Sequence, residues 1–191
     1  MQDEMNLRSY FYNLSNIFFK IKAYKSKEIE LEKAIKEVII EIEKRRKKGK
    51  VIIIGNGGSA SIASHFAIDL SKNAKVKAIT FNEASLLTCI SNDYGYENVF
   101  KKPIEIFMDK GDLLFAISSS GRSKNILEGA LKAKEKKCKV ITLSGFSPLN
   151  PLKKIGDINF YVPSNSYGFV ELIHSIICHF IVDLISNYAE R

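Results

Sequence analysis

Cysteine is scarce in this chain. The 191 residues contain three cysteines, Cys89, Cys138 and Cys178, which lie far apart in apolar stretches and form no CxxC spacing. This spacing excludes a disulfide-rich secreted scaffold and a zinc finger. We predict that the thiols are reduced core residues of a cytoplasmic protein.

The segments that direct a protein to or through a membrane are also missing. The first residues, MQDEMNLRSYFYNLS, do not combine a basic region with an apolar one, so no signal peptide is expected. Charged residues interrupt the longest apolar stretches before they could span a bilayer. We therefore expect no membrane partner.

Nucleic-acid motifs are absent as well, although the chain is basic. Lys and Arg number 29 against 21 Asp and Glu, which gives a formal net charge of +8. Such a charge suits nucleic acid, a membrane surface or an anionic small molecule. Much of it lies in KRRKKGK, residues 44–50, at the end of a helical pattern, where lysines complement the helix C-terminus. No RNA-recognition signature or heptad run accompanies it, so we interpret it as a solvated face and expect no nucleic-acid partner.

The chain does show an alternation of strand and helix patterns. Its length and its 46% hydrophobic residues fit one soluble domain, residues 1–191. Residues 4–48 have the periodicity of two helices, so N-terminal helices are assigned to 1–48 and an α/β core to 50–191. The core contains five strand patterns: KVIIIG, KAITF, DLLFAIS, KVITLSG and INFYVP. Helical segments separate most of these strands, and a long apolar helix closes the chain, whereas FSPLNPL is expected to be a loop.

This alternation predicts a three-layer α/β/α sandwich around a five-stranded parallel sheet. Ligands of such sheets bind at the carboxyl ends of the strands. After the first strand comes GNGGS, residues 55–59, whose glycines permit a tight turn and close approach to a ligand. It is neither a Walker loop nor a GxGxxG fingerprint, and no ribose-binding acid follows, which argues against a nicotinamide-dependent dehydrogenase. Taken alone, the glycine turn is equally well explained by packing.

A second loop, ISSSGRS, follows the third strand and precedes a helix. It contains four serines, Ser118, Ser119, Ser120 and Ser123. Hydroxyls and free backbone N–H groups at a helix N-terminus suit a phosphate monoester. One serine would be enough to cap the helix, so four of them favour phosphate binding.

Together, GNGGSxxxxxH, SHFA, NDYGYENVF, ISSSGRS and VITLSG resemble the SIS (sugar isomerase) domain family, which is flavodoxin-like in fold, and within it the phosphoheptose isomerases. The resemblance covers nearly the whole chain. It implies ketose–aldose isomerisation of sedoheptulose 7-phosphate to D-glycero-D-manno-heptose 7-phosphate through an enediol. It also implies a homotetramer with active sites lined by more than one subunit.

The resemblance also implies roles for individual residues. Asp69 and His179 would be the catalytic acid–base pair. Zinc would be the cofactor. Its ligands would be His65, Asp69, Glu171 and His179. The sugar phosphate would be bound by Asn56, Gly57, Gly58, Ser59, Asn92, Asp93, Ser118, Ser119, Ser120, Ser123 and Glu171.

This chain departs from the family pattern at several of these positions. Asp69 stands where the family has glutamate, and Glu171 where it has glutamine. The acid and base just before that glutamine are replaced by Gly168 and Phe169, and Arg122 follows the serine-loop glycine. A shorter carboxylate can move a base by about an ångström, enough to cost ~10²-fold in rate. These departures leave the exact substrate open.

The three histidines and the carboxylates also allow other interpretations. His65 and Asp69 are four residues apart and share a helix face. Spacing alone would pair Glu171 with His174, whereas the resemblance prefers His179, so we interpret His174 as a supporting or core residue. The alternatives are an isomerase of another ketose phosphate, or a non-catalytic domain that binds a sugar phosphate or a replication initiator. The presence of His65, Asp69 and His179 favours an enzyme.

Overall fold

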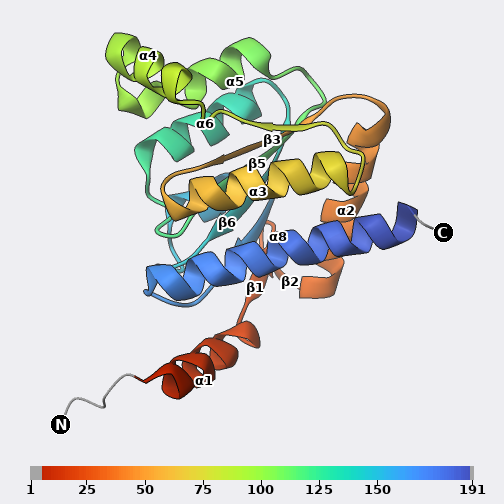
Figure 1. Cartoon of the computed structure of the whole chain (residues 1–191), viewed down its shortest axis with the longest axis vertical. Helices are drawn as coiled ribbons and strands as arrows, with labels where there is room; N and C mark the ends of the chain where they lie inside the picture. The colour runs from red at the N-terminus through yellow and green to blue at the C-terminus, as the bar shows by residue number, and fades with distance from the viewer. Residues whose placement is uncertain (1–5, 190–191) are drawn as a thin grey trace.

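The computed structural model describes residues 6–189 as an α/β domain with one central sheet (Figure 1). The seven strands run in the order β2-β1-β7-β6-β5-β3-β4. The strands are β1 (Lys22–Tyr24), β2 (Glu28–Ile29), β3 (Val51–Gly55), β4 (Ala78–Thr80), β5 (Leu113–Ser118), β6 (Lys139–Ser144) and β7 (Ile158–Tyr161). The helices are α1 (Leu7–Phe18), α2 (Leu31–Lys47), α3 (Gly58–Lys72), α4 (Ala84–Tyr94), α5 (Lys101–Phe107), α6 (Lys124–Glu135), α7 (Pro151–Ile155) and α8 (Tyr167–Ala189), with the 3-10 turn η1 at Tyr96–Asn98.

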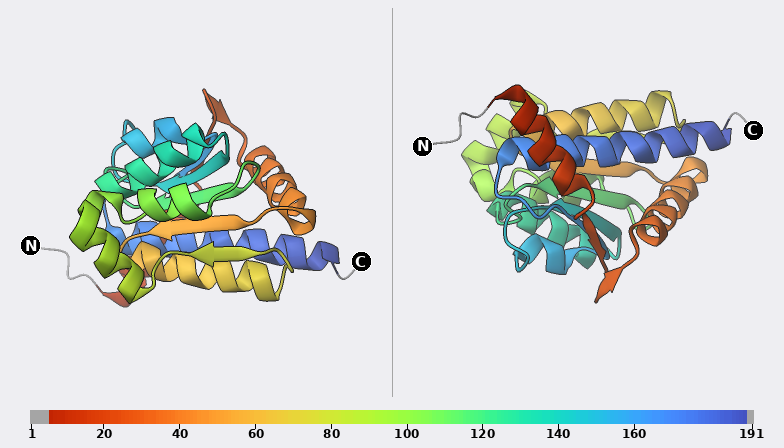
Figure 2. Two further views of the ribbon diagram at one scale, coloured as in Figure 1. Left: turned by 90° about the horizontal axis from the view of Figure 1, so that it is seen from above. Right: turned by 90° about the horizontal axis from the view of Figure 1, so that it is seen from below.

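The five predicted parallel strands are confirmed. The pairs β3–β4, β3–β5, β5–β6 and β6–β7 are all parallel. The sequence of strand β3 is continuously apolar because both faces of the strand are buried. Ile53 packs into the core on the α3 and α8 side, whereas Ile52 and Ile54 pack into the core on the α6 side. Figure 2 shows α3 and α8 on one face of the sheet and α5 and α6 on the other, which is the predicted three-layer arrangement.

The sequence predicted only helices in the N-terminal segment, and this prediction is wrong in part. Between α1 and α2 it forms β1 and β2, which pair antiparallel with each other, and β1 pairs antiparallel with β7. In β1, Ala23 is fully buried, and Lys22 bonds to Glu28 of β2 at 3.0 Å. Strands of three and two residues are too short to give an alternating pattern that stands out from a helical one.

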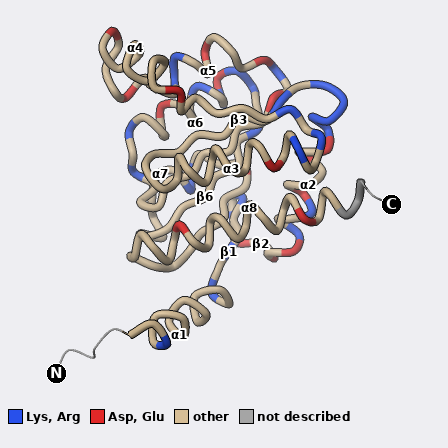
Figure 3. The backbone as a smooth tube through the Cα atoms, viewed as in Figure 1, with Lys and Arg blue, Asp and Glu red and all other residues tan. Residues whose placement is uncertain are grey.

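Three further expectations need correction. The stretch FSPLNPL is not all loop, because α7 begins at Pro151 with the side chain of Asn150 as its N-cap. Cys138 and Cys178 are buried as predicted, but Cys89 is exposed on α4. The basic run at the end of α2 is not wholly solvated, since Arg45 is 6% exposed and bonds to Glu41 at 2.6 Å. Figure 3 shows basic residues gathered near the end of α2 and the α3–β4 loop.

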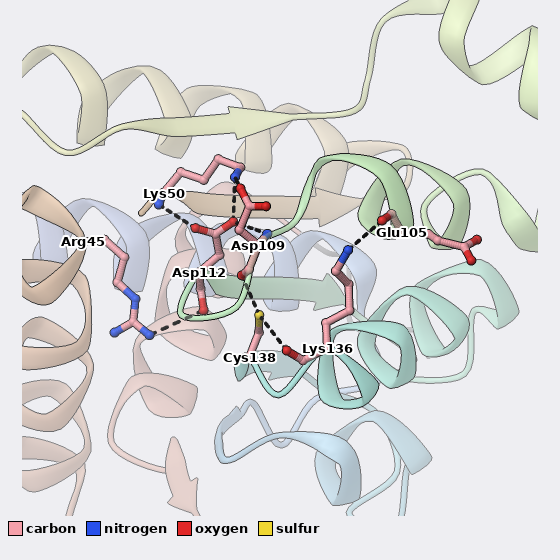
Figure 4. Close-up of polar contacts among 7 residues, drawn as sticks. All are labelled: Arg45, Lys50, Glu105, Asp109, Asp112, Lys136 and Cys138. Carbon is pink, nitrogen blue, oxygen red and sulfur yellow. Dashed lines mark hydrogen bonds and ion pairs between the residues drawn. The ribbon is translucent and has the colours of Figure 1, made fainter. Parts of the chain in front are cut away.

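Hydrogen bonds and ion pairs connect the segments at the amino end of the sheet (Figure 4). Asp112 is 1% exposed and accepts from the backbone N–H of Lys50 at 2.9 Å and of Asp109 at 2.8 Å, and it lies 2.7 Å from the Lys50 ammonium. Burial lowers the pKa of Lys50, but hydrogen bonds to Asp109 and Asp112 outweigh it and leave this pKa raised. These contacts join the segment before β3 to the turn before β5, at the end of the sheet opposite the predicted site.

Helix α8 corrects the expectation that charged residues interrupt every apolar stretch before it could span a bilayer. It is the one described helix that is long and apolar enough to cross a membrane by length and composition alone. The stretch Tyr167–Ser186 has a mean hydropathy of 1.8, and 44% of it is buried inside the domain. Its buried residues, including Ile173, Ile177 and Ile181, belong to the core on the α3 side of the sheet. Core helices of folded domains share this composition, so it is weak evidence for a membrane span.

Candidate active site

The two small-residue loops meet in one pocket, as the sequence predicted. Strands β3 and β5 are neighbours, but their following helices, α3 and α6, lie on opposite faces of the sheet. A crevice opens where connections diverge in this way. The pocket there has a volume of about 230 Å³. It is lined by Asn56, Gly57, Gly58, Ser59, Ile117, Ser118, Ser119, Ser120, Ser123, Tyr167 and Glu171.

The serine loop has unused hydrogen-bonding capacity. Ser119 is 4% exposed, and its Oγ has no hydrogen-bond partner within the described part of the chain. Ser123 is the N-cap residue of α6, yet its side chain makes no capping hydrogen bond. A buried polar atom without a partner is unfavourable unless a ligand satisfies it. The loop therefore has the chemistry of an anion site at the N-terminus of α6.

Gly121 sets the shape of this loop. Its φ is +63°, a left-handed conformation that glycine adopts without strain. A Cβ atom on Gly121 would lie 2.5 Å from Cγ of Asn150, which is fully buried. The side chain of Asn150 donates to the Ser147 carbonyl at 2.9 Å and to Ser144 Oγ at 3.1 Å, so moving it away would break buried hydrogen bonds.

The first loop brings a carboxylate into the same pocket. A Cβ atom on Gly58 would lie 2.6 Å from Cδ of Glu171, so the Glu171 carboxylate rests directly on this glycine at the start of α3. Tyr167, one turn earlier on α8, also lines the pocket. Sequence patterns did not single out Tyr167, because an aromatic residue at the start of an apolar helix has no distinguishing pattern.

Two histidines and an aspartate form a second cluster further along α3 and α8. These helices run side by side (Figure 1). The Asp69 Oδ2 atom lies 3.4 Å from His65 Nε2 and 3.6 Å from His179 Nδ1. The two imidazole rings meet edge to face with centroids 4.9 Å apart. The His65 and His179 side chains are 58% and 47% exposed, whereas Asp69 is 18% exposed. The cluster is thus open to solvent on one side.

The donor atoms of this cluster could hold one metal ion. They lie within 4.8 Å of one another. Imidazole nitrogen and carboxylate oxygen are zinc ligands, with bonds of about 2.0–2.2 Å, and three protein ligands with an open position are typical of catalytic zinc. Small side-chain rotations would bring these atoms around one ion. Glu171 is not part of the cluster in this chain, because it lies two turns earlier on α8, in the serine-loop pocket. Its assignment as a fourth ligand stays a prediction.

His174 does not join either cluster. It is fully buried, and its Nε2 lies 3.4 Å from the Ser144 carbonyl oxygen. Burial lowers the pKa of His174 to about 4, so the imidazole is neutral near pH 7. The interpretation as a core residue agrees with this position, and the pairing of Glu171 with His174 suggested by spacing does not occur.

Asn92 and Asp93 lie outside the pocket. Both are exposed near the end of α4, where Asn92 Nδ2 donates to Asp93 Oδ1 at 2.9 Å. Within one chain, nothing brings them to the serine loop, so their role in substrate binding stays a prediction. Nearby, the Tyr96 hydroxyl does reach the site and donates to Asn56 Oδ1 at 3.3 Å.

Known proteins share both the sequence and the fold of this chain. A family model described as the SIS domain matches residues 9–145. The phosphoheptose isomerase of Helicobacter pylori (strain ATCC 700392 / 26695) is 38% identical over 165 residues, which cover 83% of this chain and 85% of that protein. The phosphoheptose isomerase of Aliarcobacter butzleri (strain RM4018) is 38% identical over 164 residues, which cover 82% and 84%.

Solved structures agree with these sequence relatives. Phosphoheptose isomerase GmhA from Neisseria gonorrhoeae has 28% identity and a TM-score of 0.78, with 94% of this chain and 97% of that chain covered. A phosphoheptose isomerase from Francisella tularensis has 28% identity and a TM-score of 0.81, with 95% and 96% covered. Matches of this length and identity mean that the chain belongs to the SIS domain family and, within it, to the phosphoheptose isomerase group.

Proposed function

We propose that this protein is an aldose–ketose isomerase that converts sedoheptulose 7-phosphate to D-glycero-D-manno-heptose 7-phosphate. The observation that carries the proposal is the combination of an anion-binding serine loop with a His65–Asp69–His179 cluster on the two helices that lead away from it. The named function of the relatives in Helicobacter pylori and Aliarcobacter butzleri supports the same reaction.

The serine loop anchors the phosphate. The Ser119 hydroxyl has no partner within the described residues, the Ser123 hydroxyl makes only a 3.4 Å contact with Ser118 Oγ, and the N-terminus of α6 favours a negative charge. From Ser59 to His65, six residues further along α3, the helix rises by about 9 Å. A seven-carbon chain anchored at the serine loop would therefore extend along the α3–α8 seam toward the cluster. Binding energy at the phosphate then holds C1 and C2 in place for the reaction.

Asp69 and His179 act as the acid–base pair. Isomerisation moves a proton between C1 and C2 through an enediol, and it needs proton exchange with the two oxygens. The Asp69 carboxylate lies between two imidazoles, 3.4 Å and 3.6 Å from their nearest nitrogens, and Asn73 Nδ2 donates to its Oδ1 at 3.3 Å. His179 lies next to it on α8, and its imidazole is accessible from solvent.

We also propose that the cofactor is zinc, held by His65, Asp69 and His179. When bound, such an ion supplies Lewis-acid polarisation of the substrate oxygens. Glu171 lies nearer the serine loop. We propose that it accepts hydrogen bonds from sugar hydroxyls there, unless it moves to become a fourth ligand.

Incubation of the purified protein with sedoheptulose 7-phosphate tests the reaction and the cofactor together. With added zinc, we expect NMR signals of an aldose heptose 7-phosphate, and we expect chelation to lower the rate at least tenfold, with recovery on zinc addition but not on magnesium addition. Turnover unaffected by chelator would contradict the metal proposal. The absence of product from a folded protein would contradict the proposed substrate, and faster conversion of another ketose phosphate would favour the alternative that the Asp69 and Glu171 departures suggest.

We further propose that the protein works in the cytoplasm as a homotetramer. None of the α1 residues is buried within one chain. Three of its large apolar side chains, Leu7, Phe11 and Tyr12, are more than half exposed. Helix α8 also exposes Ile176 and Phe180 beside the cluster. Such apolar surface is usually covered by a partner. Light scattering at micromolar concentration should give four times the mass of the chain, and a monomer would contradict this proposal.

A further inference from the structure

A reciprocal amide pair joins the two loops of the pocket. Asn56 Nδ2 donates to Asn125 Oδ1 at 2.9 Å, and Asn125 Nδ2 donates back to Asn56 Oδ1 at 2.9 Å. Asn56 lies in the loop after β3, whereas Asn125 lies in the first turn of α6. Asn125 is 3% exposed and Asn56 lines the pocket. The pair therefore runs from the core on its Asn125 side to the ligand space on its Asn56 side.

The orientation of both amides follows from one backbone contact. The N–H of Ile126 donates to Asn125 Oδ1 at 3.0 Å, and a backbone N–H cannot accept. Asn125 must therefore turn its oxygen toward Ile126 and Asn56 Nδ2, and its own Nδ2 toward Asn56 Oδ1. Asn56 Oδ1 also accepts from the Tyr96 hydroxyl at 3.3 Å. Each side-chain amide has two N–H bonds, so Asn56 keeps one for a ligand.

We propose that Asn125, assisted by Tyr96, is a positioning residue that fixes Asn56 as a hydrogen-bond donor to a sugar oxygen. The inference rests on the proposed function, because it places a sugar phosphate in this pocket. Without the pair, a 180° rotation of the Asn56 amide could present an oxygen instead of an N–H at nearly the same position. The pair also ties the sugar-contacting loop to the helix that carries the phosphate loop, which keeps both ends of the substrate site in register.

The substitution Asn125→Asp tests this with almost no change in shape. An ionised carboxylate cannot donate to Asn56 Oδ1, whereas a protonated one can. At pH 8 we expect kcat/KM for sedoheptulose 7-phosphate to fall about tenfold relative to wild type, the effect of losing one buried hydrogen bond. The affinity of Asn125→Ala for inorganic phosphate, measured by calorimetry, should stay within twofold of wild type, because phosphate contacts the serine loop and this variant adds no charge beside it.

The pH dependence gives a signature that a structural defect would not give. Burial raises the pKa of the introduced carboxyl, so the variant-to-wild-type ratio of kcat/KM should rise toward one as the pH falls from 8 to 5.5. Dividing kcat/KM of the variant by that of the wild type removes the effect of groups that titrate in both proteins. With Asn125→Ala the ratio should stay low and flat. Asn98→Asp adds the same charge nearby, outside the pair. It loses the bond from Asn98 Nδ2 to the Tyr94 carbonyl, 2.7 Å in the wild type, but its ratio should stay flat from pH 8 to 5.5, whatever its level.

Several outcomes would overturn the inference: wild-type kcat/KM for Asn125→Asp at pH 8, a loss of phosphate affinity in Asn125→Ala as large as its loss of kcat/KM, or a flat ratio for Asn125→Asp. If this variant lacks a cooperative melting transition, Tyr96→Phe takes its place, because Tyr96 is 57% exposed and only its hydroxyl is removed. We expect about a threefold loss there, and no loss would also overturn the inference. If wild type does not turn over, the proposed substrate fails separately, and the same ratios are measured as calorimetric affinities for sedoheptulose 7-phosphate.

Discussion

Replacing His179 by alanine is expected to lower kcat for the proposed isomerisation by about 10³-fold, because the variant loses one member of the proposed acid–base pair. The imidazole is 47% exposed, so the fold should tolerate its removal. Calorimetry with inorganic phosphate should give wild-type affinity, since the serine loop lies at the far end of the site. Coupled-assay rates and phosphate affinity therefore separate chemistry from binding.

Two aspartates, one inside the cluster and one outside it, give a matched comparison for the loss of a carboxylate. Asp69→Asn should also lose at least 10²-fold in kcat, because the carboxylate that faces both imidazoles becomes a neutral amide. Asp183→Asn removes the same charge one turn beyond His179, at an exposed position outside the cluster, and should stay within twofold of wild type. If His179→Ala kept more than a tenth of the wild-type rate, the assigned pair would be wrong.

Replacing Gly121 by alanine is expected to destabilise the protein by about 3 kcal/mol and to abolish phosphate binding. The left-handed backbone conformation costs an alanine roughly 1 kcal/mol, and the clash with the hydrogen-bonded Asn150 side chain adds about 2 kcal/mol. The loop would have to shift, and the serine hydroxyls would no longer converge. Urea unfolding gives the stability change, and calorimetry gives the phosphate affinity.

Gly111→Ala is the control that isolates the clash. Gly111 also has a positive φ, +96°, but an added Cβ would meet no atom within 4 Å. We expect a loss of about 1 kcal/mol and unchanged phosphate affinity, because the cost is the backbone conformation alone. Equal losses of stability in the two variants would mean that Asn150 does not support the serine loop.

The parallel core and the meeting of the two loops could be predicted because their signals are local and repeated. Continuous apolar runs such as VIII in β3 are typical of strands buried on both faces, and four serines before a helix exceed what a cap needs. By contrast, β1 and β2 are too short for a pattern. They become strands because β7 offers an edge to β1, which is a long-range fact.

The parts of the site that the sequence did not give are those that depend on packing between distant elements. Glu171 and His179 lie two turns apart on α8. Glu171 contacts Gly58, whereas His179 contacts Asp69. Asn125 could have been noticed, because it shares a helix stripe with Gly129 and Ala133, and all three are buried. A polar residue on a buried stripe needs a polar partner, but only the folded chain identifies it as Asn56.

The hydrogen bonds and ion pairs among Lys50, Asp109 and Asp112 at the amino end of the sheet affect how the ligand specificity of this protein could change by mutation. The contacts that hold the strand starts together share no residue with the pocket at the other end. Substitutions at Asp69, Glu171 or Gly168 can therefore accumulate without loosening the scaffold that aligns the strands. Substitutions at these helix positions could change which sugar phosphate is bound while the alignment of the strands stays the same.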